Sequence, residues 1–218
     1  MKMKLVIFDL DGTLLNSLED LAVSANYALR KFGYQEHVTE DYRYMVGNGI
    51  TKLIERALPE DARTENEIMH VRAEFVAYYS GHMMDKTKPY PGIPELLKEL
   101  KHRGLMLAVA SNKYQDATRE LIRTYFGEGI FQVVLGQREG VPAKPDPAIV
   151  NEILGTTGAG QDDTLYVGDS CVDMQTAIHS GVTPIGVTWG FRPCKELMDN
   201  GAVHIVNRPE DILKYIGE

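Results

Sequence analysis

Residues 5–13 read Leu5-Val6-Ile7-Phe8-Asp9-Leu10-Asp11-Gly12-Thr13. An unbroken apolar run is typical of a strand that helices cover on both faces, because such a strand has no side that faces water. Two aspartates and a glycine follow the run at once, and residues of these types favour turns. We therefore expect a buried parallel strand near the amino terminus, with an acidic turn at its carboxyl end.

Similar apolar runs recur along the chain, each flanked by Gly, Asp, Asn or Ser. The predicted strands are Leu5–Phe8, Leu105–Ala110, Val133–Leu135, Leu165–Val167, Ile185–Val187 and His204–Val206. Segments with helical periodicity lie between them, at Pro94–Arg103, Gln115–Phe126, Pro147–Leu154 and Met174–Ser180. Strands that alternate with helices predict an α/β fold whose core is a doubly wound, Rossmann-like parallel sheet.

One stretch interrupts this alternation. Only helical patterning is found in Leu18–Phe32, Ile50–Leu58 and Ile68–His82, and the turn-rich Tyr90-Pro91-Gly92 follows. A crossover between parallel strands needs about a dozen residues, so roughly 65 residues of helix predict an inserted all-helical subdomain. We assign residues 1–15 and 86–218 to the α/β core and residues 16–85 to the insertion.

Length and composition exclude several classes of protein. The 218 residues suit one large domain with a smaller insertion, and 44% apolar and 25% charged residues argue against disorder. A net charge of −8 without a basic cluster argues against a nucleic-acid partner. No apolar run approaches the ~20 residues that cross a bilayer. Cys171 and Cys194 are too few for a disulfide framework. We expect a soluble, cytoplasmic protein with no nucleic-acid and no membrane partner.

Polar side chains follow four of the predicted strands at their carboxyl ends. Ligands of open α/β sheets bind beyond this edge, so side chains from several strand ends are expected to meet there. These residues are Asp9 and Asp11 after the first strand, Ser111 and Asn112 after the second, Lys144 after the third, and Asp169 with Asp173 after the fourth.

The aspartates among them predict a metal site. Asp9 and Asp11 flank one apolar residue, so the strand period points both to the same side. Carboxylates that converge at low dielectric repel one another unless a cation lies among them. Oxygen ligands without a nearby His or Cys suit Mg²⁺. We therefore predict Mg²⁺ as the cofactor, with Asp9, Asp11, Asp169 and Asp173 as its candidate ligands.

The remaining polar residues favour a phosphate group as the second ligand. Lys144 precedes Pro145 in a loop, and a fixed ammonium there would lower the repulsion between a carboxylate and a phosphate. Ser111 and Asn112 could cap the helix that begins near Gln115. They could equally offer hydroxyl and backbone N–H groups to a phosphate at that helix terminus.

Together these residues resemble the motifs of the haloacid dehalogenase superfamily of phosphohydrolases. The order is that of the superfamily, and the resemblance covers essentially the whole chain: Asp9-Leu10-Asp11-Gly12-Thr13, then Ser111, then Lys144, then Gly168-Asp169-Ser170 with Asp173. The resemblance implies that the helical insertion is a cap over the site. Within the insertion, Arg43, Gly47, Asn48 and Gly49 are similar to the cap of phosphoglycolate phosphatases, which implies that they contact the substrate.

The resemblance also implies a mechanism. Asp9 would be the nucleophile and form an aspartyl-phosphate, and a carboxylate is a competent nucleophile. Asp11 would protonate the leaving oxygen and then deprotonate the attacking water, while Lys144 would screen the negative charges. The family's metal would be held by the side chains of Asp9 and Asp169 and the backbone carbonyl of Asp11.

Further roles follow from the same resemblance. Asp173 would act in the outer shell of the metal or through water, and Ser111 with the Asn112 N–H would bind the phosphoryl oxygens. The function expected is a Mg²⁺-dependent phosphatase that acts on a small-molecule phosphate monoester, with phosphoglycolate as the favoured substrate. A monomer or a homodimer is expected.

Other functions stay open at this point. A sugar-phosphate mutase, an inorganic pyrophosphatase or a nucleotidase could use the same core. A phospho-accepting signalling module of the receiver type also gathers Asp, Ser or Thr, and Lys around Mg²⁺, but the long insertion and Asp11 argue against it. A haloacid dehalogenase proper has no need of a proton donor at Asp11.

Overall fold

The computed structural model describes residues 3–217, so residues 1–2 and 218 of the predicted core range lie outside the described residues. It divides the chain into two compact units. One unit consists of two segments, the chain up to Leu15 and the chain from Pro89 onward, and we call it the α/β unit. The other is Asn16–Lys88, which we call the helical unit.

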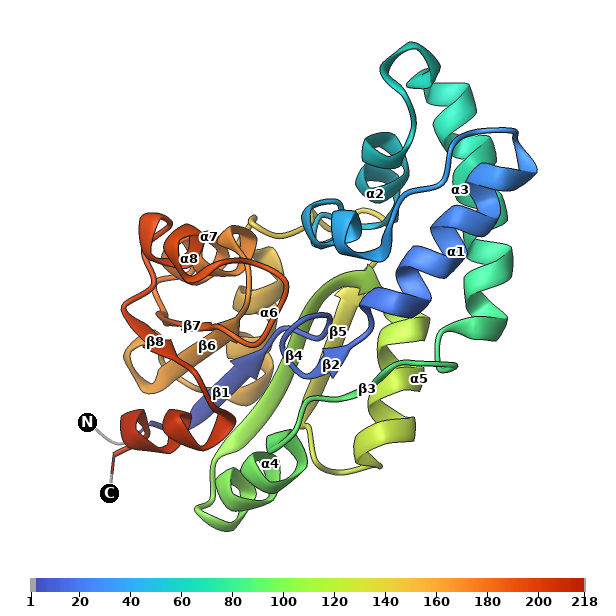
Figure 1. The fold of residues 1–218 in the computed structure, drawn as a ribbon. Coiled ribbons are helices and arrows are strands. Elements are labelled where there is room, and N and C mark those ends of the chain that lie inside the picture. Colours follow the sequence, from blue (N-terminus) through green and yellow to red (C-terminus); the bar gives the residue numbers. More distant parts are fainter. Residues whose placement is uncertain (1–2, 218) are drawn as a thin grey trace. The chain divides into compact units, whose positions relative to one another are not determined.

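The α/β unit is built on a parallel sheet of six strands within the described residues (Figure 1). The strand order is β5-β4-β1-β6-β7-β8, and every neighbouring pair is parallel. This order runs outward from β1 in both directions, which is the doubly wound topology, so the predicted fold class is confirmed. The strands are β1 (Leu5–Phe8), β4 (Met106–Tyr114), β5 (Val133–Gln137), β6 (Thr164–Gly168), β7 (Thr183–Val187) and β8 (His204–Val206).

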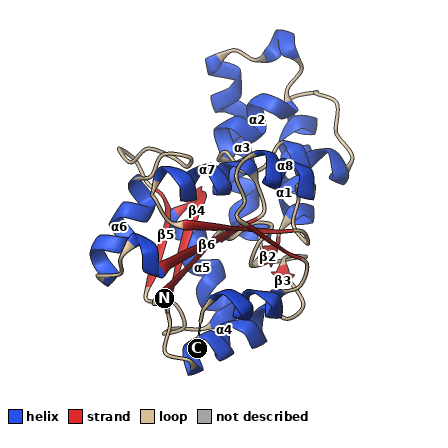
Figure 2. Cartoon of the chain, turned by 90° about the vertical axis from the view of Figure 1, so that its left-hand side faces the viewer, coloured by secondary structure: helices blue, strands red, loops and turns tan. Residues whose placement is uncertain are grey.

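Helices of the α/β unit lie beside these strands, as Figure 2 shows in blue and red. The central strand β1 is entirely buried, from Leu5 to Phe8, because it pairs on both edges and is covered on both faces. The helices are α4 (Ile93–His102), α5 (Gln115–Phe126), α6 (Ala148–Thr157), α7 (Cys171–His179) and α8 (Cys194–Asp199), with short 3₁₀ turns at Gln161–Asp163 and Pro209–Tyr215.

Several elements differ from the expectation, and three of these differences bear on the site and its surroundings. Helix α7 begins at Cys171 rather than at Met174, because Ser170 and Asp173 form a capping box at its start. Strand β4 continues through the polar residues to Tyr114. Helix α8 was not predicted, and its six residues are too few for periodicity to reveal.

The helical unit contains α1 (Leu18–Lys31), α2 (Ile50–Ala57) and α3 (Glu65–His82), with 3₁₀ turns at Thr39–Tyr44 and Glu60–Ala62. Helices α1 and α3 pack along each other, and the Tyr27 and Tyr78 rings stack with centroids 3.9 Å apart. Short strands β2 (Leu15–Asn16) and β3 (Lys88–Pro89) pair where the chain enters and leaves this unit. Among residues 3–217, no helix combines the length and the apolar character that crossing a membrane requires.

Asp20, in the first turn of α1, is a buried carboxylate within the helical unit. Its side chain accepts hydrogen bonds from the backbone N–H of Lys86, at 3.0 and 3.1 Å, and from that of Thr87, at 2.8 Å. The Thr87 hydroxyl donates a further bond of 2.7 Å. Asp20 therefore ties the first helix of the unit to the segment that leaves it.

Candidate active site

The turn after β1 positions two aspartates. The Asp9 N–H donates to the Val167 carbonyl of β6 at 2.9 Å, so Asp9 still follows the sheet. The chain then folds back, with the N–H groups of Leu14 and Leu15 both bonded to the Leu10 carbonyl at 3.0 Å. Gly12 allows this turn because its φ is +88°, and a Cβ there would lie 2.3 Å from Oδ2 of Asp169. The acidic turn is therefore packed directly against the end of β6.

Three buried carboxylates converge at this edge of the sheet. One ligand oxygen from each of Asp9, Asp169 and Asp173 lies within 4.8 Å of the other two. Burial, with the charge of Asp173 beside it, raises the pKa of Asp9 to about 7. Burial likewise raises the pKa of Asp169 well above its usual range, with Asp173 and Asp9 contributing. A divalent cation would relieve this repulsion, and an all-oxygen set of donors fits Mg²⁺.

Asp169 is held mainly by neutral donors. The backbone N–H of Phe191 donates to its Oδ2 at 2.7 Å, and the Thr13 hydroxyl donates to its Oδ1 at 3.3 Å. The Thr13 carbonyl in turn accepts the indole N–H of Trp189 at 3.0 Å. The loop after β7 and the turn after β1 therefore aim Asp169 at Asp9 while leaving much of its negative charge uncompensated.

Asp173 has a different environment from the other two. Its Oδ2 accepts bonds from the N–H and the hydroxyl of Ser170, at 3.1 and 2.6 Å. Its Oδ1 accepts from Lys144 Nζ at 2.7 Å and from the Tyr166 hydroxyl at 3.3 Å. A carboxylate offers about four lone-pair positions, and these four bonds engage them. Asp173 thus caps α7 and holds Lys144, and a direct bond to a metal would displace one of these donors.

Lys144 is buried between two of the carboxylates. Its Nζ lies 2.9 Å from Oδ1 of Asp9 and 2.7 Å from Oδ1 of Asp173. Although burial lowers its pKa, the charges of Asp173 and Asp9 raise the pKa of Lys144 well above its usual range, so the group stays an ammonium. Tyr166, on β6, completes the network with its hydroxyl 3.0 Å from Nζ.

Asn112 and Ser111 support the site through the backbone. The Asn112 side chain donates to the Lys144 carbonyl at 3.1 Å and accepts from the Lys144 N–H at 2.9 Å, so it clamps the loop that carries Lys144. The Ser111 hydroxyl accepts from the Lys113 N–H at 3.1 Å. Helix α5 is preceded by Tyr114 as its cap residue, so neither side chain caps that helix.

Two further residues of this network had no role assigned from the sequence. Lys113 Nζ lies 2.9 Å from Oδ2 of Asp11, and Tyr166 binds Lys144 and Asp173. Lys113 directly follows Ser111 and Asn112 at the same predicted strand end, and this position in the sequence could have identified it as a site residue. Tyr166 lies within a strand whose apolar pattern gave no such signal.

The four residues predicted from the cap resemblance lie in the helical unit. Arg43 forms an ion pair with Glu40. Gly47, Asn48 and Gly49 form the turn that leads into α2, and the two glycines have φ values of +114° and +82°. Arg56 donates to the Asn48 side chain at 2.8 Å. These contacts describe the local turn, and the role of the four residues in binding substrate stays a prediction.

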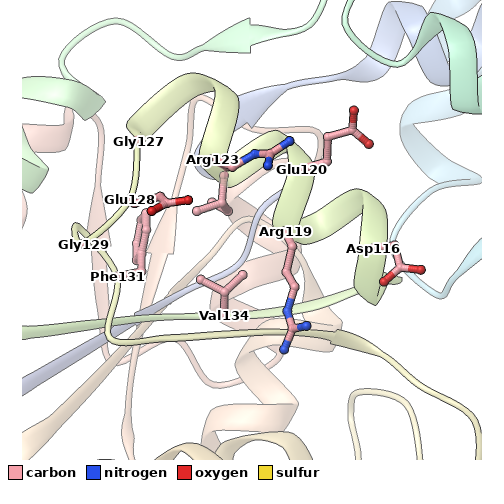
Figure 3. A pocket seen from close by; sticks show the side chains of 10 residues that line it. Asp116, Arg119, Glu120, Arg123, Gly127, Glu128, Gly129, Phe131 and Val134 are labelled. Atoms are coloured by element: carbon pink, nitrogen blue, oxygen red, sulfur yellow. The ribbon is translucent and has the colours of Figure 1, made fainter.

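A separate hollow of about 600 Å³ lies beside α5 and the loop that leads to β5 (Figure 3). It contains none of the predicted site residues. Its charged side chains have both signs, since Arg119, Arg123, Glu120, Glu128 and Asp116 all line it. A mixed lining of this kind does not select a strongly charged ligand, so the carboxylate cluster remains the candidate site.

Comparisons with known proteins agree with this geometry. Residues 6–187 match the model of the family "Haloacid dehalogenase-like hydrolase". The phosphoglycolate phosphatase of Mannheimia succiniciproducens is 32% identical over 219 residues, with 98% of each chain covered. That of Haemophilus influenzae (strain 86-028NP) is 35% identical, with 86% of this chain and 87% of the relative covered.

Solved structures give the same result. A crystal structure from Lactobacillus delbrueckii subsp. bulgaricus, provisionally named a phosphoglycolate phosphatase, is 35% identical to this chain. It matches with a TM-score of 0.94 over 99% of both chains. The chain therefore belongs to the haloacid dehalogenase-like hydrolase family, and the predicted enzyme class, a phosphoric monoester hydrolase, is confirmed.

Proposed function

We propose that the protein is a Mg²⁺-dependent phosphatase that hydrolyses phosphoglycolate through a covalent phosphate on Asp9. The environment of Asp9 is the observation that carries this proposal. Its buried carboxylate contacts an ammonium at 2.9 Å and lies within 4.8 Å of Asp169. The relatives named phosphoglycolate phosphatase support the choice of substrate.

The residues present fit a divalent cation. We assign the side chains of Asp9 and Asp169 and the backbone carbonyl of Asp11 as its ligands. Asp173 is assigned to the outer shell of the cation, because its oxygens already bond to Ser170, Tyr166 and Lys144. When bound, Mg²⁺ supplies positive charge that lets an anionic nucleophile and an anionic phosphate approach each other.

The reaction then takes two steps on this chain's own residues. An oxygen of the Asp9 carboxylate forms a bond to phosphorus while the bond from phosphorus to the ester oxygen breaks, and Asp11 gives that oxygen its proton. Water next attacks phosphorus and passes a proton to Asp11, while the bond between phosphorus and Asp9 breaks. Phosphate leaves, and Asp9 is again a carboxylate.

Other groups bind and orient the phosphate during these steps. Lys144 stays protonated between Asp9 and Asp173 and screens the incoming negative charge. The Ser111 hydroxyl and the Asn112 N–H are assigned to the phosphoryl oxygens.

The helical unit, predicted as residues 16–85, is proposed as the cap that excludes water and selects the substrate. Arg43 and the turn at residues 47–49 are the candidate substrate contacts within it. Residues 1–15 and 86–218 would form the catalytic core. A cytoplasmic location and a monomeric or homodimeric state stay predictions.

A substrate panel tests the proposal. Purified protein with Mg²⁺ is given phosphoglycolate, sugar phosphates, nucleotides and pyrophosphate, and kcat/KM is compared. We expect phosphoglycolate to exceed the others by about tenfold or more, as a dedicated site should provide. Acid quenching with phosphorus-labelled substrate should trap the label on wild-type protein but not on Asp9→Asn.

Each alternative has its own outcome in this experiment. Similar kcat/KM values across the panel would replace the proposal with a broad phosphatase, and a preference for nucleotides or pyrophosphate would replace the substrate. Activity that requires a sugar bisphosphate would indicate a mutase. A stable phosphorylated form without turnover would indicate a signalling module.

A further inference from the structure

The second lysine of the site, Lys113, pairs with Asp11 in the same way that Lys144 pairs with Asp9. Its Nζ lies 2.9 Å from Oδ2 of Asp11, and the side chains are only 4% and 12% exposed. The family motifs quoted above include Lys144 but assign nothing to Lys113. Each aspartate of the acidic turn therefore has an ammonium beside it, and the two ammonium groups come from different segments of the chain.

An irregularity in the sheet sets the position of Lys113. Strand β4 pairs with β5 at Ala110 opposite Leu135 and again at Tyr114 opposite Gln137, so β4 carries extra residues between these pairs. Bulges of this kind re-aim side chains beside active sites. Between these pairs β4 has three residues where β5 has only Gly136, so two residues are extra. The three are Ser111, Asn112 and Lys113, which include the two assigned to phosphate binding.

Close packing fixes the backbone of Lys113 within this bulge. Its N–H donates to the Ser111 hydroxyl at 3.1 Å, and its carbonyl accepts from the Thr118 hydroxyl at 3.1 Å. Strand β5 approaches so closely that a Cβ on Gly136 would lie 2.5 Å from the Lys113 carbonyl. The direction in which the lysine leaves the backbone is thus held from both sides.

Stability alone is a weak explanation for such a pair. Removing two charges from water costs more than a modest ion pair returns, and well-packed apolar residues often stabilise a fold equally well. By contrast, the exposed pair of Lys195 with Asp199 on α8 loses little hydration. A buried pair that includes the proposed proton donor calls for a reason in the reaction.

We propose that Lys113 is a positioning residue that acts through Asp11. This role rests on the proposed function. The ammonium holds Asp11 by Oδ2 and fixes the rotation of the carboxyl group, so that Oδ1 gives its proton to the departing ester oxygen. The same orientation returns in the second step, when Asp11 takes a proton from water. This role of Lys113 favours one substrate class, because alkyl phosphates release a strongly basic alkoxide and depend on this proton, whereas aryl phosphates with acidic phenols do not.

Two esters of different leaving group separate this role from a structural one. In Lys113→Met we expect kcat/KM for phosphoglycolate to fall by about 100-fold, the lower end of the contribution of a general acid. For 4-nitrophenyl phosphate, kcat/KM should stay within about threefold, because nitrophenolate leaves without a proton. Stopped-flow mixing should also show a burst of nitrophenolate, since the slowed attack by water follows its release.

A double-mutant cycle tests whether Lys113 acts through Asp11. Adding Lys113→Met to Asp11→Asn should cause no further loss on phosphoglycolate, because residues that act as a unit are not additive. Lys195→Met is the matched control: it also removes a lysine paired with an aspartate, at 2.6 Å, but from a side chain that is 82% exposed. It should leave both esters unaffected.

Several outcomes would overturn the role of Lys113. Parallel losses on both esters would indicate phosphate binding or general packing, and unchanged activity on both would show that Asp11 needs no support. An additive loss in the double variant would separate Lys113 from Asp11. A wild-type protein that releases phosphate from neither ester would instead remove the proposed function, and this role with it.

A second variant covers the case in which Lys113→Met does not fold. Lys113→Arg keeps the positive charge, but its planar guanidinium cannot occupy the position of Nζ. Phosphoglycolate activity should then fall while activity on 4-nitrophenyl phosphate holds, and equal losses on both would again count against the proposal.

Discussion

Asp20 and Asp9 are both buried carboxylates, one in each unit, and their surroundings differ in kind. Asp20 is 3% exposed and accepts hydrogen bonds from neutral groups of Lys86 and Thr87. Asp9 is 8% exposed, contacts one ammonium, and has the carboxylates of Asp169 and Asp173 close by.

The difference shows what burial does to a carboxylate in this protein. Neutral donors satisfy the buried oxygens of Asp20, so this side chain links two distant segments. Like charges around Asp9 oppose its charged form, so the folded protein holds a repulsion that a ligand can relieve. The first arrangement supports the fold, whereas the second is the one that the proposed reaction requires.

The largest effect should come from removing the charge of Asp9. In Asp9→Asn we expect kcat to fall by at least about 10⁴-fold, because the nucleophile is lost. The fold should survive, which circular dichroism and thermal unfolding would check. Metal-dependent turnover by this variant would contradict the assignment of the nucleophile.

The corresponding change in the helical unit, Asp20→Ala, should lower the stability of the fold. The N–H groups of Lys86 and Thr87 would lose a charged acceptor, at a cost of about 3 kcal/mol in free energy of unfolding. Urea denaturation measures this cost, and hydrogen exchange should speed up at these two amides. A loss below about 1 kcal/mol would show that Asp20 does not hold these two segments together.

A smaller effect is expected on stability in the absence of metal. Here the loss of the Asp9 charge should stabilise the fold, and the gain should depend on pH. The folded protein holds the pKa of Asp9 near 7, above the ordinary value of 3.8, because of burial and the Asp173 charge. Between these values the folded state binds more protons than the unfolded state, so the stability that protonated Asp9 contributes at low pH is lost as pH rises toward 7.

In EDTA, Asp9→Asn should therefore be more stable than wild type by about 2 kcal/mol at pH 8, and the difference should shrink toward pH 4. Excess Mg²⁺ should reduce this difference in stability at pH 8, because the cation binds the carboxylates of the wild type and so stabilises the wild type more than the variant. Thermal unfolding of both proteins at pH 8 and pH 4, with and without Mg²⁺, measures this difference in stability. A difference that does not change with pH or Mg²⁺ would mean that Asp9 carries no such repulsion.

Much of the fold was readable from local patterns. Strand β1 and helix α5 have the predicted bounds, because unbroken apolar character and helical periodicity are properties of adjacent residues. Helix α7 begins at Cys171, before the predicted start at Met174, because Ser170 and Asp173 have the spacing of a capping box, which periodicity alone does not reveal.

The sequence by itself indicated which polar side chains gather at one edge of the sheet, since the ends of parallel strands share that edge and their polar residues are visible in the chain order. Only the tertiary structure decided how these residues are paired. It showed that Lys144 contacts Asp9, that Lys113 contacts Asp11, and that Asp173 is engaged by donors. The physical reason is that such contacts depend on bulges, turns and packing between segments far apart in the chain, which no local pattern encodes.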